Sequence, residues 1–122
     1  MEYRISQIID EIQSNLKNQI TVEAMALQAD LSRDHFTKLF KNIIGKTPIQ
    51  YVRDKRLEKS CELLKTTNKR VKTIMCEVGI RDQTHFVRDF KAKYGLTPNE
   101  YRQNYWDKIQ IEKAKLNNHG NG

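Results

Sequence analysis

The side chains best suited to binding occur twice in this sequence, fifty residues apart. The segment HFTKLFKNIIGKTP, residues 35–48, returns as HFVRDFKAKYGLTP, residues 85–98. Basic residues stand at matching places, Lys38 and Arg88, and such side chains donate hydrogen bonds to guanine O6 and N7 or to phosphate oxygens. Val87 can contact a thymine methyl group. This chemistry indicates a nucleic acid as partner, and the duplication indicates two places that meet it.

Catalytic and metal chemistry have less support in the sequence. His35 and His85 are equivalent in the repeat, but they lack a companion acid or cysteine at ligand spacing. We interpret them as histidines at the starts of helices. Cys61 and Cys76 fall near the apolar faces of expected helices, and we interpret them as small core residues. No enzyme activity, metal site or cofactor is predicted.

The composition narrows the class of protein further. The chain has 122 residues and a formal net charge of +7. The length suits one ordinary domain or two very small ones, and the charge favours nucleic acid, a membrane surface or an acidic protein as partner. No apolar run is long enough to span a bilayer, and the first residues, MEYRISQIID, lack a signal-peptide core. We therefore expect a cytoplasmic protein without membrane partners.

Apolar residues at helical spacing predict an all-α fold of about seven helices. The first helix covers about residues 3–17. Thr21 caps a second helix, which ends near Asp30, and Ser32 caps a third, which ends at Gly45, where a left-handed residue is needed. The expected core face of the third helix consists of Phe36, Leu39, Phe40 and Ile43.

A long helix should join the two copies of the repeat. Thr47 and Gln50 can form a capping box around Pro48, so this linker helix is expected to run to about Lys65. Its expected buried residues are Ile49, Val52, Leu57, Cys61 and Leu64.

The second half of the chain repeats the first in a shorter form. A helix begins near Val71, and another is capped by Asp82 and ends at Gly95. A second capping box at residues 97–100 starts the last helix, which is expected to reach about Trp106. The predicted organisation is a first subdomain (1–47), a linker helix (48–65), a second subdomain (66–106) and a polar, disordered C-terminal tail (107–122).

The repeated unit has the plan of a helix-turn-helix. The short helices match at an offset of forty-nine, as Val22 matches Val71, and the longer helices match at an offset of fifty. In the DNA-binding form of this motif the second helix enters the major groove. The outward stripe of that helix is Asp34, Thr37, Lys38 and Lys41 in the first copy, and Thr84, Val87, Arg88 and Lys91 in the second.

Two sets of DNA contacts follow from these stripes and their flanks. The candidates for base readout are Arg33, Asp34, Thr37, Lys38, Gln83, Thr84, Val87 and Arg88. The candidates for phosphate contacts are Ser32, Lys41, Lys46, Lys72, Arg81 and Lys91. Backbone N–H groups at the helix starts near Val22 and Val71 can also meet phosphates.

The sequence resembles the DNA-binding domain of the AraC/XylS family of bacterial transcription regulators over about residues 5–104. In the first half the resemblance rests on Ser32, Phe36, Phe40-Lys41 and GKTPIQY at 45–51. It continues through Arg56-Leu57 of the linker helix. In the second half it rests on the segments GIRDQTHFVRDFK (79–91) and GLTPNEYR (95–102).

This resemblance implies seven helices in two helix-turn-helix units, whose recognition helices enter adjacent major-groove segments of double-stranded promoter DNA. It also implies activation through contacts with RNA polymerase. A single chain with two recognition helices is expected to act as a monomer on DNA if it stands alone. The alternatives are a helical module that binds an acidic protein, and a non-specific DNA-binding fragment of a larger regulator.

Several positions depart from the family pattern, among them Ser60, which stands where the linker helix usually has alanine. Asp30 stands where a turn glycine is common, and aspartate tolerates the left-handed conformation better than most residues. Met75 replaces an alanine that the first copy keeps as Ala26. Asp89 replaces the apolar Leu39, so that face of the second recognition helix is expected to be less buried.

Overall fold

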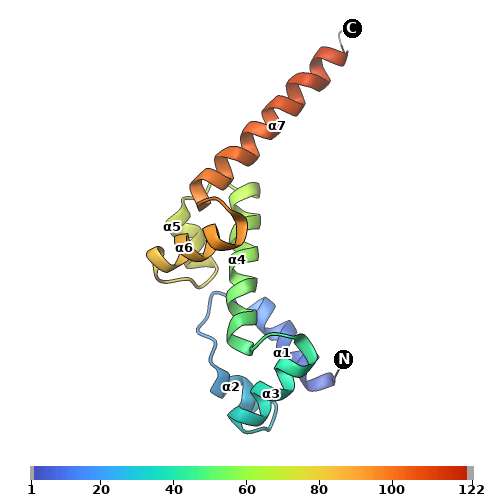
Figure 1. Cartoon of the computed structure of the whole chain (residues 1–122), viewed down its shortest axis with the longest axis vertical. Coiled ribbons are helices and arrows are strands. Elements are labelled where there is room, and N and C mark those ends of the chain that lie inside the picture. Colours follow the sequence, from blue (N-terminus) through green and yellow to red (C-terminus); the bar gives the residue numbers. More distant parts are fainter. Residues whose placement is uncertain (1, 121–122) are drawn as a thin grey trace.

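The computed structural model describes residues 2–120, and it describes side-chain surroundings for residues 2–117. The predicted all-α architecture is confirmed: the described residues form helices and no strand. Figure 1 shows α4 along the middle of an elongated molecule, with α1, α2 and α3 at one end, α5 and α6 beside its other half, and α7 extending away. The seven helices are α1 (Tyr3–Ser14), α2 (Val22–Gln28), α3 (Arg33–Ile44), α4 (Pro48–Thr66), α5 (Val71–Glu77), α6 (Gln83–Tyr94) and α7 (Pro98–Gly120).

Helices α3 and α6 begin and end at the predicted residues. Ser32 Oγ accepts a hydrogen bond from the backbone N–H three residues on, at 3.2 Å. Asp82 Oδ1 accepts the equivalent bond at 2.9 Å. Both helices end at a left-handed glycine, Gly45 with φ 89° and Gly95 with φ 81°. The two helices are therefore held at both ends by local contacts.

Complete capping boxes start α4 and α7, as predicted. Thr47 Oγ1 accepts from the N–H of Gln50 at 3.2 Å, and Gln50 Oε1 accepts from the N–H of Thr47 at 3.0 Å. Thr97 and Glu100 form the same pair of bonds at 3.3 and 3.0 Å. Because the Glu100 carboxylate accepts that backbone N–H, the pKa of Glu100 lies below its ordinary value.

Each half of the molecule has its own aromatic core, and α4 contributes to both. Val52 of α4 lies in the first core, whereas Leu57 of α4 lies in the second. Complete burial of one large apolar side chain stabilises the fold by roughly 1.5–3 kcal/mol, so the four phenylalanines contribute much of the folding free energy of the two cores. Those four are Phe36, Phe40, Phe86 and Phe90, all essentially inaccessible to solvent.

Two expectations about burial were wrong. Ile49 is 42% exposed, because Pro48 occupies the buried first position of α4 and Ile49 lies about 100° further round the helix. Cys76 is exposed, because its neighbour Met75 occupies the buried face of α5. Leu39 packs against the first core, and the side chain of Asp89, which stands in the equivalent place, is 32% exposed.

The last helix is longer than the sequence predicts: it was expected to end near Trp106, and residues 107–120, predicted as a tail, continue it. Helix α7 continues to Gly120, while residues 121–122 lie outside the described residues. Residues 107–119 contain no glycine or proline and are rich in good helix formers such as lysine, glutamate, alanine and leucine. A helix that is already nucleated by the capping box extends at little cost through such a sequence. No helix of residues 2–120 has the length and apolar character needed to cross a membrane.

Candidate nucleic-acid interface

The turns of the two helix-turn-helix units have the same backbone geometry. In the first unit, the N–H groups of Asp30 and Leu31 bond to the carbonyls of Leu27 and Ala26, both at 3.0 Å. In the second unit, Gly79 and Ile80 make the equivalent bonds, at 3.2 and 2.9 Å, to the last turn of α5. This pair of bonds is a Schellman motif, which requires a left-handed residue after the helix. Asp30 has φ 56° and Gly79 has φ 79°, so both copies aim the second helix in the same way.

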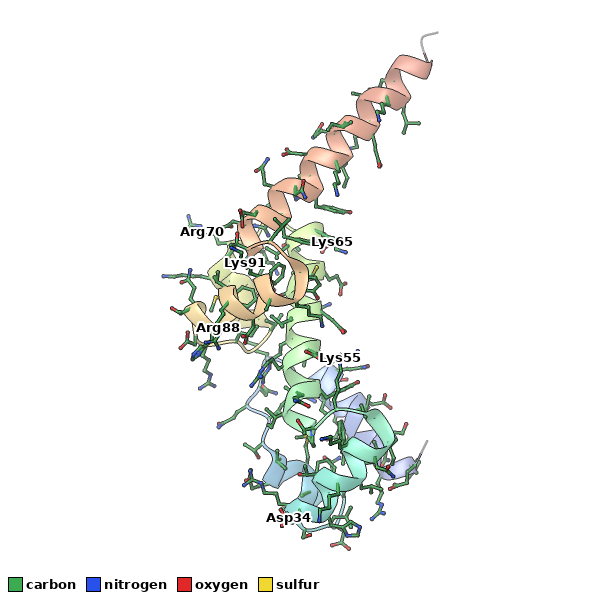
Figure 2. The ribbon with its side chains drawn as sticks, in the orientation of Figure 1. Asp34, Lys55, Lys65, Arg70, Arg88 and Lys91 are labelled. Atoms are coloured by element: carbon green, nitrogen blue, oxygen red, sulfur yellow. The ribbon has the colours of Figure 1, made fainter. Side chains whose placement is uncertain are left out.

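The predicted stripe of α3 lies on the outer surface of the first unit. Arg33, Asp34, Lys38 and Lys41 are exposed, and Thr37 is half-buried. Figure 2 shows Asp34 at the outer end of this unit, away from α4. Arg33 is held in an exposed ion pair, with Nη1 at 2.8 Å from Glu23 Oε1. The stripe can thus present cations, a carboxylate and a hydroxyl to a partner.

The predicted stripe of α6 is also on the outer surface. Gln83, Thr84, Arg88 and Lys91 are exposed, and Val87 is half-buried. Figure 2 shows Arg88 on the side of the second unit that faces away from α4. Arg88 Nε lies 3.5 Å from Asp89 Oδ1, a long and exposed contact that leaves most of the guanidinium available.

The remaining candidates for phosphate contacts have different surroundings. Ser32 Oγ acts as an acceptor at the start of α3, so its hydroxyl proton is still available to a phosphate. Lys72 and Arg81 are exposed. Lys46 Nζ donates to Asp54 of α4 at 2.5 Å, and this bond raises the pKa of Lys46. Lys46 is therefore the candidate that must exchange a partner to reach DNA.

The titratable groups at the start of α6 differ from those of α3. The pKa of Asp82 lies below its ordinary value, because its carboxylate accepts the backbone N–H of His85. The ring Nδ1 of His85 also lies 3.2 Å from Asp82.

No group of three or more potential metal ligands occurs among the described residues. The interpretation of His35 and His85 as residues at helix starts is confirmed by their places in α3 and α6.

Arg56 is a structurally important residue that sequence reasoning noted only as part of a motif. Its Nε donates to the carbonyl of Leu16 at 3.2 Å, and its Nη2 donates to the carbonyl of Asn18 at 2.9 Å. Partial burial, with the nearby charge of Arg81, lowers the pKa of Arg56. The sequence could not reveal this contact, because every residue has a backbone carbonyl and none of them marks the acceptor, which lies forty residues away.

The fold and these two exposed helix faces define a double helix-turn-helix protein. A family profile described as a helix-turn-helix domain matches residues 25–104. The chain belongs to the AraC/XylS family of helix-turn-helix transcription regulators, which confirms the family resemblance of its sequence.

Known relatives match most of this chain. The transcriptional regulator AlkR of Acinetobacter baylyi is 33% identical over 103 residues, which are 84% of this chain and 34% of AlkR. The lactose operon transcription activator of Staphylococcus xylosus is 31% identical over 101 residues, 83% of this chain and 36% of that protein. The chain thus spans about a third of the length of these relatives.

A solved structure with the same fold is the DNA-binding domain of the transcriptional factor AdpA in complex with a target DNA. It matches with a TM-score of 0.84, covering 88% of this chain and 96% of that one, at 24% sequence identity. This likeness establishes the arrangement of the helices.

Proposed function

We propose that this chain binds double-stranded promoter DNA in a sequence-specific manner, with α3 and α6 in adjacent segments of the major groove. The observation that supports this most is the pair of equivalent units, joined by the continuous helix α4, in which α3 and α6 each expose a polar and cationic face. The 19 residues of α4 span roughly 28 Å at 1.5 Å per residue. That length is comparable with one turn of DNA, about 34 Å, once the breadth of the recognition helices is added.

Within this proposal the two sets of residues have different tasks. Lys38 and Arg88 donate to guanine edges, Asp34 accepts from cytosine N4, and Val87 contacts a thymine methyl group. Arg33, Thr37, Gln83 and Thr84 complete the base readout. Ser32, Lys41, Lys46, Lys72, Arg81 and Lys91 hold the phosphates on either side.

The ion pair of Arg33 with Glu23 does not oppose this assignment. Both side chains are more than 60% exposed. Exposed pairs are worth at most about 1 kcal/mol, so Arg33 can leave Glu23 for a guanine or a phosphate at small cost. Because Glu23 competes for the Arg33 guanidinium, weak and non-specific binding of other anions to Arg33 should be reduced.

We further propose that the chain is the DNA-binding part of a bacterial activator that works at promoters in the cytoplasm and contacts RNA polymerase. One of the relatives is named as an activator. A monomer is sufficient on DNA in this proposal, because one chain carries both recognition helices.

The experiment that tests the proposed function is selection of random duplexes by the chain at near-physiological salt, followed by sequencing. An asymmetric motif with two short blocks about one helical turn apart is expected. Binding without sequence enrichment, which vanishes as salt rises, would contradict sequence-specific readout and would favour a non-specific fragment or a protein-interaction module.

A further inference from the structure

The turn of the second unit is in direct contact with the first unit. A methyl group on Gly79, in the turn between α5 and α6, would lie 2.1 Å from the backbone carbonyl oxygen of Leu16. Leu16 follows α1 and packs against the first core. The backbone of Gly79 is therefore seated against the first unit, and any larger residue there would have to separate the two units.

The backbone conformation alone does not explain the glycine at this place. Asp30 occupies the equivalent turn of the first unit with φ 56°, and its side chain is exposed. A left-handed turn residue in this motif can thus carry a side chain. At Gly79 the additional requirement is the close approach to Leu16.

Arg56 of α4 binds the same carbonyl group that faces Gly79. Its guanidinium donates to the carbonyls of Leu16 and Asn18, so the Leu16 oxygen both receives Arg56 and faces Gly79. A planar guanidinium with two fixed donors holds two acceptors in a defined geometry, which a flexible ammonium does not.

Around this contact the units are separated by open space. A cavity of about 420 Å³ lies between the segment that follows α1, the middle of α4 and the turn before α6. Its walls include Gln19 and Ile20 of the first unit and Ile80 and Arg81 of the second. The second unit is also held to α4 by buried residues, since Leu57, Cys61 and Leu64 of α4 share one core with Phe86 and Phe90 of α6. Exposed ion pairs between the same helices, such as Lys93 Nζ with Glu58 at 3.7 Å, contribute little rigidity. The contact at Gly79 differs from these because it joins the two units directly.

We propose that Leu16, Arg56 and Gly79 form a junction that, together with α4, fixes the separation and angle of α3 and α6, and so narrows the spacing between two DNA blocks that the chain accepts. Arg56 is a positioning residue in this proposal, since it acts on the recognition helices through Leu16 and Asn18. The claim about DNA spacing rests on the proposed function, whereas the claim about the junction does not. One added base pair moves a block by about 3.4 Å and turns it by about 35°, so a locked pair of helices must discriminate between spacings.

The junction is tested by a distance measurement that needs no DNA. Spin labels are placed on α2, at Leu27→Cys, and on α5, at the native Cys76, in a Cys61→Ala background. Leu27 is 80% exposed and Cys76 is exposed, so the labels do not disturb the cores. Double electron–electron resonance then gives the distribution of distances between the two units.

Arg56→Ala is compared with Arg102→Ala, which is a matched control. Arg102 makes the same kind of clamp within the second half, with Nε donating to Leu64 O at 3.0 Å and Nη2 to Thr67 O at 3.2 Å. We expect a narrow distribution for the parent chain and for Arg102→Ala, and a broad or shifted one for Arg56→Ala. An Arg56→Ala distribution with the same mean distance and width as that of the parent, or an equal change in both variants, would overturn the junction.

The consequence for DNA is tested with the selected duplex and with duplexes whose blocks are moved by one or two base pairs. The parent should lose about tenfold or more in affinity on the altered duplexes, because DNA must be deformed to fit. Arg56→Ala should lose less than about threefold there, while binding the best duplex more weakly than the parent. Equal spacing discrimination by both proteins would overturn the claim. If the parent selected no sequence at all, the proposed function would fail, and the distance distributions would still decide the junction.

A second pair of variants separates the contact from the backbone effect. Gly79→Ala and Gly95→Ala both place a side chain at positive φ, but nothing lies within 4 Å of a methyl group on Gly95. Only Gly79→Ala should shift the distance between the units. An equal shift in both variants, or none in Gly79→Ala when it is folded, would contradict the role of the Leu16 contact.

Discussion

Serine caps α3 and aspartate caps α6, although the two helices hold equivalent places in the repeat. The next helices differ in the same sense, because the capping box of α4 uses Gln50 and that of α7 uses Glu100. The first unit therefore closes these helix starts with neutral groups and the second with carboxylates. The hydrogen-bond geometry is the same in both, so the fold requires an acceptor at these places and not a charge.

The outward faces of α3 and α6 differ more than their inward faces. Both inward faces carry two phenylalanines one turn apart, with ring centroids 5.8 Å from each other in each pair. Outside, Asp34 and Lys38 of α3 stand where α6 has Thr84 and Arg88. Two units with one scaffold and two different polar faces are suited to reading two different blocks, which is why an asymmetric DNA motif is expected.

The largest expected effect is the loss of folding free energy when one core phenylalanine is removed, and it shows whether the two cores unfold independently. Phe40→Ala and Phe90→Ala each remove a fully buried ring and should cost about 3–5 kcal/mol of folding free energy. The first should expose amides of α2 and α3 to hydrogen exchange before those of α5 and α6, and the second should do the reverse. Phe90 packs against the rings of Phe86, Tyr94 and Tyr101, so its loss should be the greater. Simultaneous loss of protection in both halves would show a single cooperative unit.

The next effect concerns the difference between the outward faces. Lys38→Ala and Arg88→Ala should each cost about 1–3 kcal/mol of binding free energy on the selected duplex and relax specificity at one base pair. The relaxed position should lie in one block for Lys38→Ala and in the other for Arg88→Ala. Lys91→Ala is the control, since a lost phosphate contact weakens all sequences alike and reduces the salt dependence. A uniform loss in all three variants would contradict the assignment of base readout.

The difference in caps predicts a difference in acid sensitivity. The pKa values of Asp82 and Glu100 are lowered in the folded chain, in both cases chiefly by backbone hydrogen bonds. A carboxyl with a lowered pKa stabilises the fold above its unfolded value, near about pH 4, and this contribution is lost as pH falls through the folded value. The first turns of α6 and α7 should therefore fray below about pH 4, before those of α3 and α4.

Backbone chemical shifts, followed as the pH is lowered, measure this fraying helix by helix. The double variant Asp82→Ser with Glu100→Gln gives the second unit the neutral caps of the first and should abolish the difference. The idea fails if the first turns of all four helices fray together in the parent chain.

The smallest expected effect concerns a cap that the second unit lacks. Thr21 Oγ1 accepts from the N–H of Ala24 at 3.1 Å and so caps α2, whereas Arg70 before α5 makes no side-chain cap. Arg70 already has the extended backbone of a cap residue, with φ −64° and ψ 149°. Arg70→Ser should therefore raise the stability of the second unit by about 0.5–1 kcal/mol, measured by hydrogen exchange of α5 amides. Thr21→Val is the counterpart and should destabilise α2. If Arg70→Ser brought no gain, the missing side-chain cap would not be what limits the stability of α5.

The helices and their order could be predicted because the signals are local. Thr47 with Gln50, Ser32, Asp82 and the glycines after α3 and α6 act within one turn of themselves, so the sequence states them directly. The phenylalanine pairs are equally readable, because a spacing of four residues places both on one helix face. The candidate contact residues on α3 and α6 follow from the same periodicity, and all of them lie at the surface or are half-buried.

The features that were missed depend on contacts between distant parts of the chain. Ile49 and Cys76 looked like core residues by type, and only the packing of their neighbours shows that they are not. The pairing of Lys46 with Asp54 and the clamp of Arg56 on Leu16 join separate elements. The continuation of α7 was missed for another reason: residues 107–122 were interpreted as a tail because they are polar and terminal, although helix propensity alone extends the helix.

That continuation of α7 has a consequence for assembly. Helix α4 leads out of the first unit and buries Leu57, Ser60, Cys61 and Leu64 beneath the second. Fifty residues on, α7 leads out of the second unit with Asp107, Gln110, Ile111 and Ala114 in those places. Ile111 is 57% exposed, so α7 offers a further repeat one large apolar side chain where α4 offers Leu57, Cys61 and Leu64. This reduced apolar seam disfavours head-to-tail packing of copies on α7, the kind of contact from which filaments grow.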